Sequence, residues 1–229
     1  NVTSWGSLRT ALEQDLVKAD VVLVQEHHLA AHACAAAVKA AGRAGYLADF
    51  VPAWPTGNKD GTSGGVAILV KRYIGFRAAE QQGPDGQAPR HHRLAAWHVS
   101  AGIKGGFLAC SAYFHTGEGV GERNQNLLFQ VGRLVHTAAK PYIVAADWQV
   151  SPEELHPSWL RSVKGAVCRS GRPTCISWAH SSEIDYFVAG RGMELLISDV
   201  AVDDKIPVRP HRAVQLSVRA VMPADQVKA

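Results

Sequence analysis

The sequence is short of the features that would assign it to a special class of protein. It has four cysteines in 229 residues and no CxxC pair, which argues against a disulfide scaffold and a cysteine-rich zinc site. It has no signal peptide and no apolar run of about 18 residues, so we expect no membrane partner and an intracellular location, with the nucleus included. Because an initiator Met is also lacking, we expect residues 1–229 to be one domain excised from a longer protein, and a monomer in isolation.

The few cysteines allow two interpretations at one place. Cys34 and Cys110 lie in apolar surroundings typical of small buried side chains. Cys168 and Cys175 bracket the stretch CRSGRPTC, which could close a disulfide loop or contribute to zinc binding. Free thiols are the favoured interpretation for a protein inside the cell.

The charge balance is modest and unevenly distributed. Hydrophobic residues make up 47% of the chain and charged residues 19%, which is typical of a globular protein and not of a disordered one. The net charge is +4, and residues 71–104 hold six Lys or Arg against two acids. Such a basic bias suits an anionic partner such as nucleic acid, although many unrelated proteins share it.

Apolar runs of strand length recur along the whole chain. They lie at residues 21–25, 65–70, 94–99, 107–114, 142–147, 184–189, 195–202 and 213–218. Helical signals predict helices at 7–18, 29–43 and 121–138, and a fourth that begins at Ser151. Exposed loops are expected at 55–65 and 80–93. Helices alternate with strands early, but the later part is dense in strands, which predicts an α+β sandwich rather than a purely parallel sheet.

Side chains that can do chemistry lie at the ends of several of these strands. They are Glu26, Tyr113, Asp147, Gln149, Asp185 and His211. Carboxylates can hold a divalent cation or activate water, and a histidine can neutralise charge on a phosphate. The set therefore suits metal-assisted cleavage of a phosphodiester bond.

Short motifs follow one another in an order that is similar to that of a known family. They are Asn1-Val2-Thr3-Ser4-Trp5, Leu23-Val24-Gln25-Glu26, Gly64-Gly65-Val66-Ala67-Ile68, Ser111-Ala112-Tyr113, Ala146-Asp147-Trp148-Gln149, Ser182-Glu183-Ile184-Asp185-Tyr186 and Pro210-His211. Each motif is weak alone, whereas the shared order is specific. Over nearly its whole length the chain resembles the endonuclease/exonuclease/phosphatase (DNase I-like) family, and most of all the endonuclease domains of non-LTR retroelements.

This resemblance implies a fold, an activity and a set of roles. The fold would be a four-layer α/β sandwich of two face-to-face mixed β-sheets flanked by helices. The activity would be divalent-metal-dependent hydrolysis of a phosphodiester, with Mg²⁺ or Mn²⁺ as cofactor and DNA as substrate. The implied roles are metal binding for Glu26, water activation for Asp147 with Gln149 and Asn1, and contact with phosphate for Tyr113 and for His211 paired with Asp185.

Three departures from the family pattern leave other functions open. Gln149 replaces an Asn and lengthens the amide by one methylene, and Pro210 replaces an Asp that helps to bind metal. Thr3 stands where some members have another ligand, so Glu26 would be the one strong protein ligand. The alternatives are a catalytically decayed domain that still binds nucleic acid or protein, and a phosphatase or phosphodiesterase of small phosphorylated molecules.

Other conspicuous residues have a structural interpretation beside a functional one. His28 and His32 have the helical spacing of zinc ligands, but together with His27 they are expected to form an exposed helix start. Trp148 could stack on a base or fill the core. Residues that could touch a nucleic-acid backbone, with solvated loop charges as the default, are Arg72, His91, His92 and Arg93. Neighbours that could compensate for the altered motif are His115 and Asp204.

Overall fold

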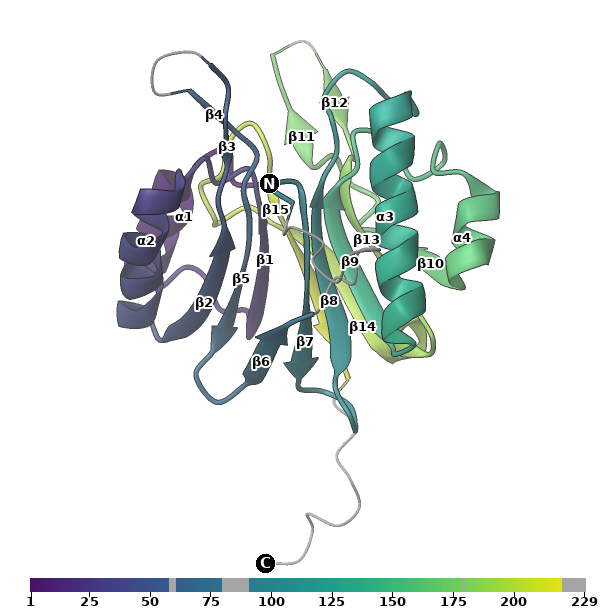
Figure 1. Cartoon of the computed structure of the whole chain (residues 1–229), viewed down its shortest axis with the longest axis horizontal. Helices are drawn as coiled ribbons and strands as arrows, with labels where there is room; N and C mark the ends of the chain where they lie inside the picture. The colour runs from purple at the N-terminus through teal and green to yellow at the C-terminus, as the bar shows by residue number, and fades with distance from the viewer. Residues whose placement is uncertain (58–60, 80–90, 179, 220–229) are drawn as a thin grey trace, which may run out of the picture.

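The computed structural model describes residues 1–57, 61–79, 91–178 and 180–219 of the chain (Figure 1). The helices are α1 (Trp5–Glu13), α2 (Ala31–Arg43), α3 (Glu122–Ala138) and α4 (Pro157–Val163), with a 3₁₀ turn at η1 (Met193–Leu196). The longer strands are β1 (Val21–Gln25), β2 (Tyr46–Val51), β5 (Val66–Lys71), β6 (Gly75–Ala78), β7 (Leu94–Ser100), β8 (Phe107–Tyr113), β9 (Tyr142–Asp147), β10 (Gly165–Cys168), β13 (Asp185–Gly190), β14 (Ile197–Asp203) and β15 (Ala213–Val218). The two-residue strands are β3 (Trp54–Pro55), β4 (Thr62–Ser63), β11 (Cys175–Ile176) and β12 (Ser181–Ser182).

Two sheets lie face to face, and helices cover their outer sides (Figure 1). One sheet has the order β1-β5-β2 and is antiparallel. The other has the order β10-β13-β9-β8-β7-β6 and is mixed, because β8 and β9 run parallel. Helices α1 and α2 lie outside the smaller sheet, and α3 and α4 lie outside the larger one. This four-layer α/β sandwich confirms the predicted fold class. Both sheets were expected to be mixed, but among the described strands only the larger sheet contains a parallel pair.

The side chains of β8 alternate between two apolar cores. Leu108, Cys110 and Ala112 belong to the core beneath α3, whereas Ala109 and Tyr113 belong to the core between the sheets. A strand that is covered on both faces reads as a continuous apolar run, which explains the sequence FLACSAY of β8. A third core lies beneath α1 and α2, so each sheet is fixed from both sides.

A buried polar link joins the two sheets near the ends of their central strands. Gln25, at the end of β1, donates Nε2–H to Ser111 Oγ at 2.8 Å, and Ser111 donates its hydroxyl to the Val24 carbonyl at 2.8 Å. Both side chains are buried. A sliding movement of one sheet would leave these polar atoms unpaired inside the protein, which is costly. The link therefore holds the ends of β1 and β8 in register.

Most of the predicted elements are confirmed. Strands β1, β9 and β15 have the predicted bounds, and β7 and β8 form an antiparallel hairpin. The helix predicted from Ser151 is wrong: residues 151–155 form a turn in which the Ser151 N–H donates to Glu154 Oε2 at 2.8 Å, and α4 begins at Pro157. Of the expected loops, residues 58–60 and 80–90 lie outside the described residues, while β3 and β4 pair with each other. No helix in the described part of the chain is long and apolar enough to cross a membrane.

His27 lies in the core, and its expected place at an exposed helix start is wrong. The side chain is buried against the Phe50 ring, with ring centroids 5.2 Å apart. Its Nε2 lies 3.1 Å from the Val51 carbonyl, and its Nδ1 accepts the Leu29 N–H at 3.0 Å. Only the neutral ring with its hydrogen on Nε2 satisfies both bonds. In agreement, burial lowers the pKa of His27 to about 4.

Acid should therefore destabilise the fold through His27. The folded-state pKa lies below the value of about 6.5 in the unfolded chain, so the unfolded state binds a proton first as the pH falls. The neutral His27 ring makes its full contribution to stability above pH 6.5. As the pH approaches 4, we expect the free energy of unfolding to fall by about 3 kcal/mol. Urea unfolding at several pH values would measure this loss. In a His27→Gln variant, which keeps a donor and an acceptor, the loss should be smaller by that amount; an unchanged pH dependence would contradict the assignment.

Candidate active site

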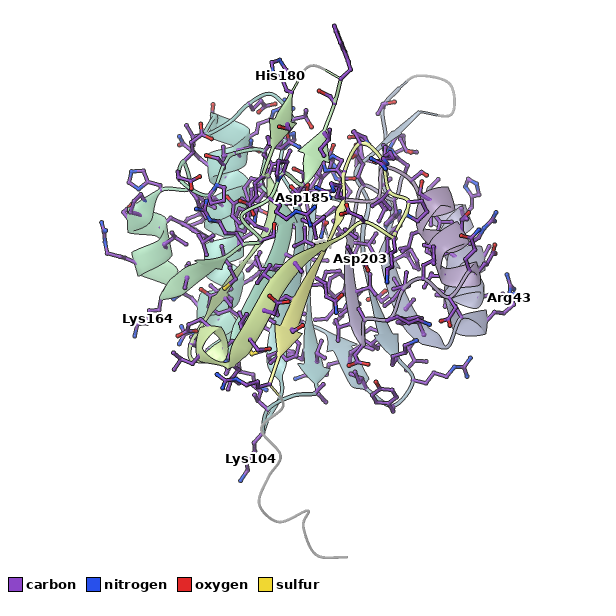
Figure 2. The ribbon with its side chains drawn as sticks, turned by 180° about the vertical axis from the view of Figure 1, so that it is seen from behind. Arg43, Lys104, Lys164, His180, Asp185 and Asp203 are labelled. Carbon is purple, nitrogen blue, oxygen red and sulfur yellow. The ribbon has the colours of Figure 1, made fainter. Side chains whose placement is uncertain are left out.

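Strand register places three chemically active side chains in one row across the larger sheet. Because β8 and β9 run parallel, Tyr113 lies beside Asp147, and because β13 runs antiparallel to β9, Asp185 lies on the other side of Asp147. Each of the three is a terminal residue of its strand. Figure 2 shows Asp185 near one end of the sandwich, far from Lys104 at the other. Glu26 follows β1 of the facing sheet, so both sheets contribute to the same place.

Asn1 connects the acids of the two sheets. Its Nδ2 donates to Glu26 Oε2 at 2.7 Å and to Asp147 Oδ2 at 2.9 Å. The side-chain oxygen Oδ1 of Asn1 accepts the Thr3 N–H at 2.8 Å, and this bond orients the amide. One side-chain amide thus holds together two carboxylates that are far apart in the sequence.

Glu26 is kept ionised by its hydrogen bonds. Although burial acts against the charged form, bonds from His28, Tyr113 and Asn1 lower the pKa of Glu26 to about 2. The Tyr113 hydroxyl donates to Glu26 Oε1 at 2.7 Å, and burial raises the pKa of Tyr113 to about 12, so the phenol remains a donor at neutral pH. The carboxylate is therefore a fixed negative charge at the junction of the sheets.

Asp147 has the opposite electrostatic environment. It is fully buried, and burial together with the charge of Asp185 raises its pKa to about 6. Gln149 donates Nε2–H to Asp147 Oδ1 at 2.7 Å, while Asn1 occupies Oδ2. A carboxylate with a pKa near neutrality and both oxygens oriented is suited to accept a proton during a reaction.

Asp185 orients the imidazole of His211. His211 Nδ1 lies 2.8 Å from Asp185 Oδ2, and because an ionised carboxylate accepts only, Nδ1 carries the hydrogen. The other nitrogen, Nε2, faces Asp147 Oδ2 at 3.8 Å. Thr174, which was not identified from the sequence, supports this pair: its buried hydroxyl oxygen accepts the N–H groups of Ile184 at 3.1 Å and Asp185 at 2.9 Å. No local signal distinguishes Thr174 from other loop threonines.

Replacing Thr174 with Val should destabilise the fold and displace Asp185. The change leaves the buried N–H of Asp185 and the partly buried N–H of Ile184 without an acceptor, which costs about 2 kcal/mol. Thermal unfolding would measure the loss. Thr174→Ser, which keeps the hydroxyl and loses a methyl group, is the matched control and should cost about 1 kcal/mol. Equal losses in the two variants would contradict the role of the hydroxyl.

The structure brings all the predicted site residues together. They are Asn1, Glu26, Tyr113, Asp147, Gln149, Asp185 and His211. Asp204 does not compensate for Pro210, because it is ion-paired with Arg172 and Arg212 at the surface. The buried hydroxyl of Thr3 has no partner among the described residues.

The zinc interpretation of the early histidines finds no support. His28 Nδ1 lies 2.8 Å from the Thr62 carbonyl, whereas His32 is exposed on α2. In the described part of the chain, the group of possible metal ligands that lies within 4.8 Å is Asp147, Asp185 and His211. Trp148 is a core residue, stacked between Phe114 and Tyr186 with ring centroids 5.1 and 5.3 Å away, so it is not placed to stack on a base.

The donor atoms at the site fit a hard divalent cation. Glu26, Asp147 and Asp185 supply carboxylate oxygens from both sheets, and His211 supplies a nitrogen. Mg²⁺ and Mn²⁺ are held by one or two carboxylates together with water and substrate phosphate. Glu26, which is ionised and reaches the junction of the sheets, is suited to such a ligand role.

The two paired sheets and their strand order are those of the DNase I-like fold. No known family profile matches the sequence, and no curated protein matches it. Solved structures do match. The AP endonuclease LMAP from Leishmania major superposes with a TM-score of 0.72 at 15% identity, covering 96% of this chain and 86% of that chain.

Two further structures show the same fold. The endonuclease domain of TRAS1, a telomere-specific non-LTR retrotransposon, has a TM-score of 0.65 at 16% identity and covers 93% of this chain and 92% of its own. The 3′ phosphatase NExo from Neisseria, bound to a product DNA hairpin, has a TM-score of 0.65 at 18% identity, with 95% and 96% covered. The fold expected from the sequence resemblance is thus confirmed.

Proposed function

We propose that the chain hydrolyses phosphodiester bonds in DNA with the help of a divalent cation. The observation that carries the proposal is the Asn1 amide, which bridges Glu26 and Asp147 beside the Asp185–His211 pair. Three groups therefore lie close together: the ionised carboxylate of Glu26, the carboxylate of Asp147 with its raised pKa, and the oriented imidazole of His211. DNA as substrate is supported by the endonucleases and the DNA-bound phosphatase that share the fold.

Asp147 is the general base of the proposed reaction. It accepts the proton of the attacking water, while Gln149 and Asn1 hold its two oxygens in place. The extra methylene of Gln149 does not prevent this contact, because its amide reaches Asp147 Oδ1 at 2.7 Å. This observation favours catalysis over a decayed site.

His211 and Tyr113 stabilise negative charge on the phosphate. Asp185 fixes His211 so that Nε2 points to the reacting region, where a protonated ring donates to a phosphate oxygen. The Tyr113 hydroxyl lies on the other side of Asp147, and its single hydrogen, which now bonds Glu26, becomes a second donor to the phosphate when that bond is released. When bound at Glu26, a divalent cation would neutralise charge on the phosphate and on the leaving oxygen.

Nicking of supercoiled plasmid tests the proposal. The purified protein should nick the plasmid with Mg²⁺ or Mn²⁺ and not with EDTA, and a Glu26→Gln variant should need a higher cation concentration for the same rate. Nicking that is independent of metal would contradict the proposal. Binding of plasmid or abasic duplex without cleavage would instead indicate a decayed binding domain, and activity confined to small phosphate esters would indicate a phosphatase.

A further inference from the structure

A buried arginine that has no anionic partner among the described residues lies beside the candidate active site. Arg93 is 8% exposed, and its guanidinium packs over the Tyr113 ring at 4.5 Å. It donates to Ser63 Oγ at 2.9 Å and to the carbonyls of Tyr113 and Phe114 at 3.4 and 3.3 Å. Its Nε is buried and has no partner among the described residues. The expectation of a solvated loop charge is therefore wrong for Arg93. Within the described part of the chain its guanidinium bonds neutral groups, and a buried cation in such surroundings favours an anion nearby.

Three partly exposed histidines surround Arg93. His91 Nδ1 accepts the Arg93 N–H at 3.2 Å, and the rings of His91 and His92 are 4.5 Å apart between centroids. The His92 ring also lies 5.8 Å from the ring of Trp54 on β3. His115 follows Phe114, whose carbonyl accepts a bond from Arg93. Across the described residues, the rings of His92 and His115 have no hydrogen-bond partner of their own.

The charges that act on these rings are predominantly positive. Burial, and then the charges of His91, Arg93 and His115, lower the pKa of His92 to about 4. Burial, and then the charges of Arg93, Arg123 and His91, lower the pKa of His115 to about 4. The surrounding acids are engaged, because Glu118 pairs with Arg123 and Glu26 accepts bonds from Tyr113 and Asn1. An anion placed among the rings would remove the repulsion and allow them to take up protons.

We propose that His91, His92 and His115, with Arg93 beneath them, bind a second phosphate group, outside the position that is cleaved. That this phosphate belongs to DNA, next to the cleaved bond, rests on the proposed function. The site itself takes a tetrahedral oxyanion, because imidazolium N–H groups donate charge-assisted bonds to its oxygens. Binding takes up protons, so the affinity rises as the pH falls.

DNA binding measured without cleavage tests the flanking role. Fluorescence anisotropy of a short duplex in EDTA, at constant ionic strength, should show binding about tenfold tighter at pH 5.5 than at pH 7.5. This is the gain expected if binding raises the pKa of one of these histidines from about 4 to the ordinary value of about 6.5. A His92→Gln/His115→Gln variant should lose most of this pH dependence, and the remainder belongs to Asp147, whose raised pKa of about 6 lies in the same range. A His136→Gln variant, changed at an exposed position on α3, should keep it. Equal melting temperatures would establish that the variants are folded.

Inorganic sulfate, which does not titrate in this range, tests the site on the wild-type protein. Sulfate added at pH 5.5 should shift the Cε1–H resonances of His92 and His115 and leave that of His136 unchanged. If sulfate shifts the His92 and His115 resonances but the protein does not bind DNA, the anion site is supported and the proposed function is overturned. The anion site is overturned if sulfate shifts neither resonance, and the flanking role is overturned if the double variant keeps the full pH dependence. Neither result decides the proposed function, which the metal-dependent nicking assay tests separately.

Discussion

Replacing Asp147 with Asn is expected to lower the rate of DNA cleavage about a thousandfold. The variant has nearly the same shape, but its amide cannot accept the proton of the attacking water. Its nitrogen would also face one of the donors on Gln149 or Asn1, which now bond to the two carboxylate oxygens. Single-turnover cleavage of a labelled duplex with saturating Mg²⁺ would measure the chemical step, and binding in EDTA should change much less.

The control for this loss is an acid outside the site. Asp199→Asn, at an exposed position of β14, should leave the cleavage rate within about twofold of the wild type. Cleavage by Asp147→Asn at more than a tenth of the wild-type rate would remove Asp147 from the role of base. A contaminating nuclease would reveal itself because all the variants would then cleave equally.

Replacing Gly65 with Ala should destabilise the fold by about 4 kcal/mol, as the sum of two costs. Gly65 has φ +89°, and a Cβ there would lie 2.5 Å from Cε1 of the buried His27 ring. The backbone conformation costs 1–2 kcal/mol for a residue with a side chain, and about 2–3 kcal/mol more comes from forcing the ring away from its bonds to Val51 and Leu29. Chemical denaturation would measure the sum.

The second cost can be separated from the first by a matched glycine. Gly45 has φ +86°, and a Cβ there would meet nothing within 4 Å. Gly45→Ala should therefore show the backbone cost alone, about 1–2 kcal/mol. If both variants lost the same stability, the contact with His27 would be unimportant. If neither lost any, the left-handed backbone would not be needed at either position.

Strand ends were the part of the site that could be predicted from the sequence. Asp147 and Glu26 close apolar runs, and a charge at the end of such a run is a local pattern that short motifs reinforce. The α+β class followed from the runs of apolar residues, whereas the four-layer sandwich followed from the family resemblance that the short motifs carry. That Asn1 would bridge Glu26 and Asp147 depends on two sheets meeting, and no spacing in the sequence encodes the distances of 2.7 and 2.9 Å.

Residues whose partners are remote in the sequence were misjudged or missed. His27 has its partner at Val51, and Arg93 has partners at Ser63 and Phe114, so each charged or polar side chain that suggested exposure is buried. Strand β2 was not predicted because it contains Asp49, and the partner of that carboxylate is Trp97 Nε1 on β7, at 2.7 Å. In each case tertiary contacts override a local preference for solvent.

The division of the site between the two sheets has a consequence for how the chain could be controlled or engineered. Both helices and all strands of the smaller-sheet half precede residue 72, whereas every strand of the larger sheet except β6 follows residue 93. Asn1 and Glu26 therefore belong to one half of the chain, and Tyr113, Asp147 and His211 to the other. A break between Ala79 and His91 would give two pieces that each hold an incomplete site. Activity would then report on reassociation of the pieces, as in a split enzyme, and the Gln25–Ser111 link would be part of what they must rebuild.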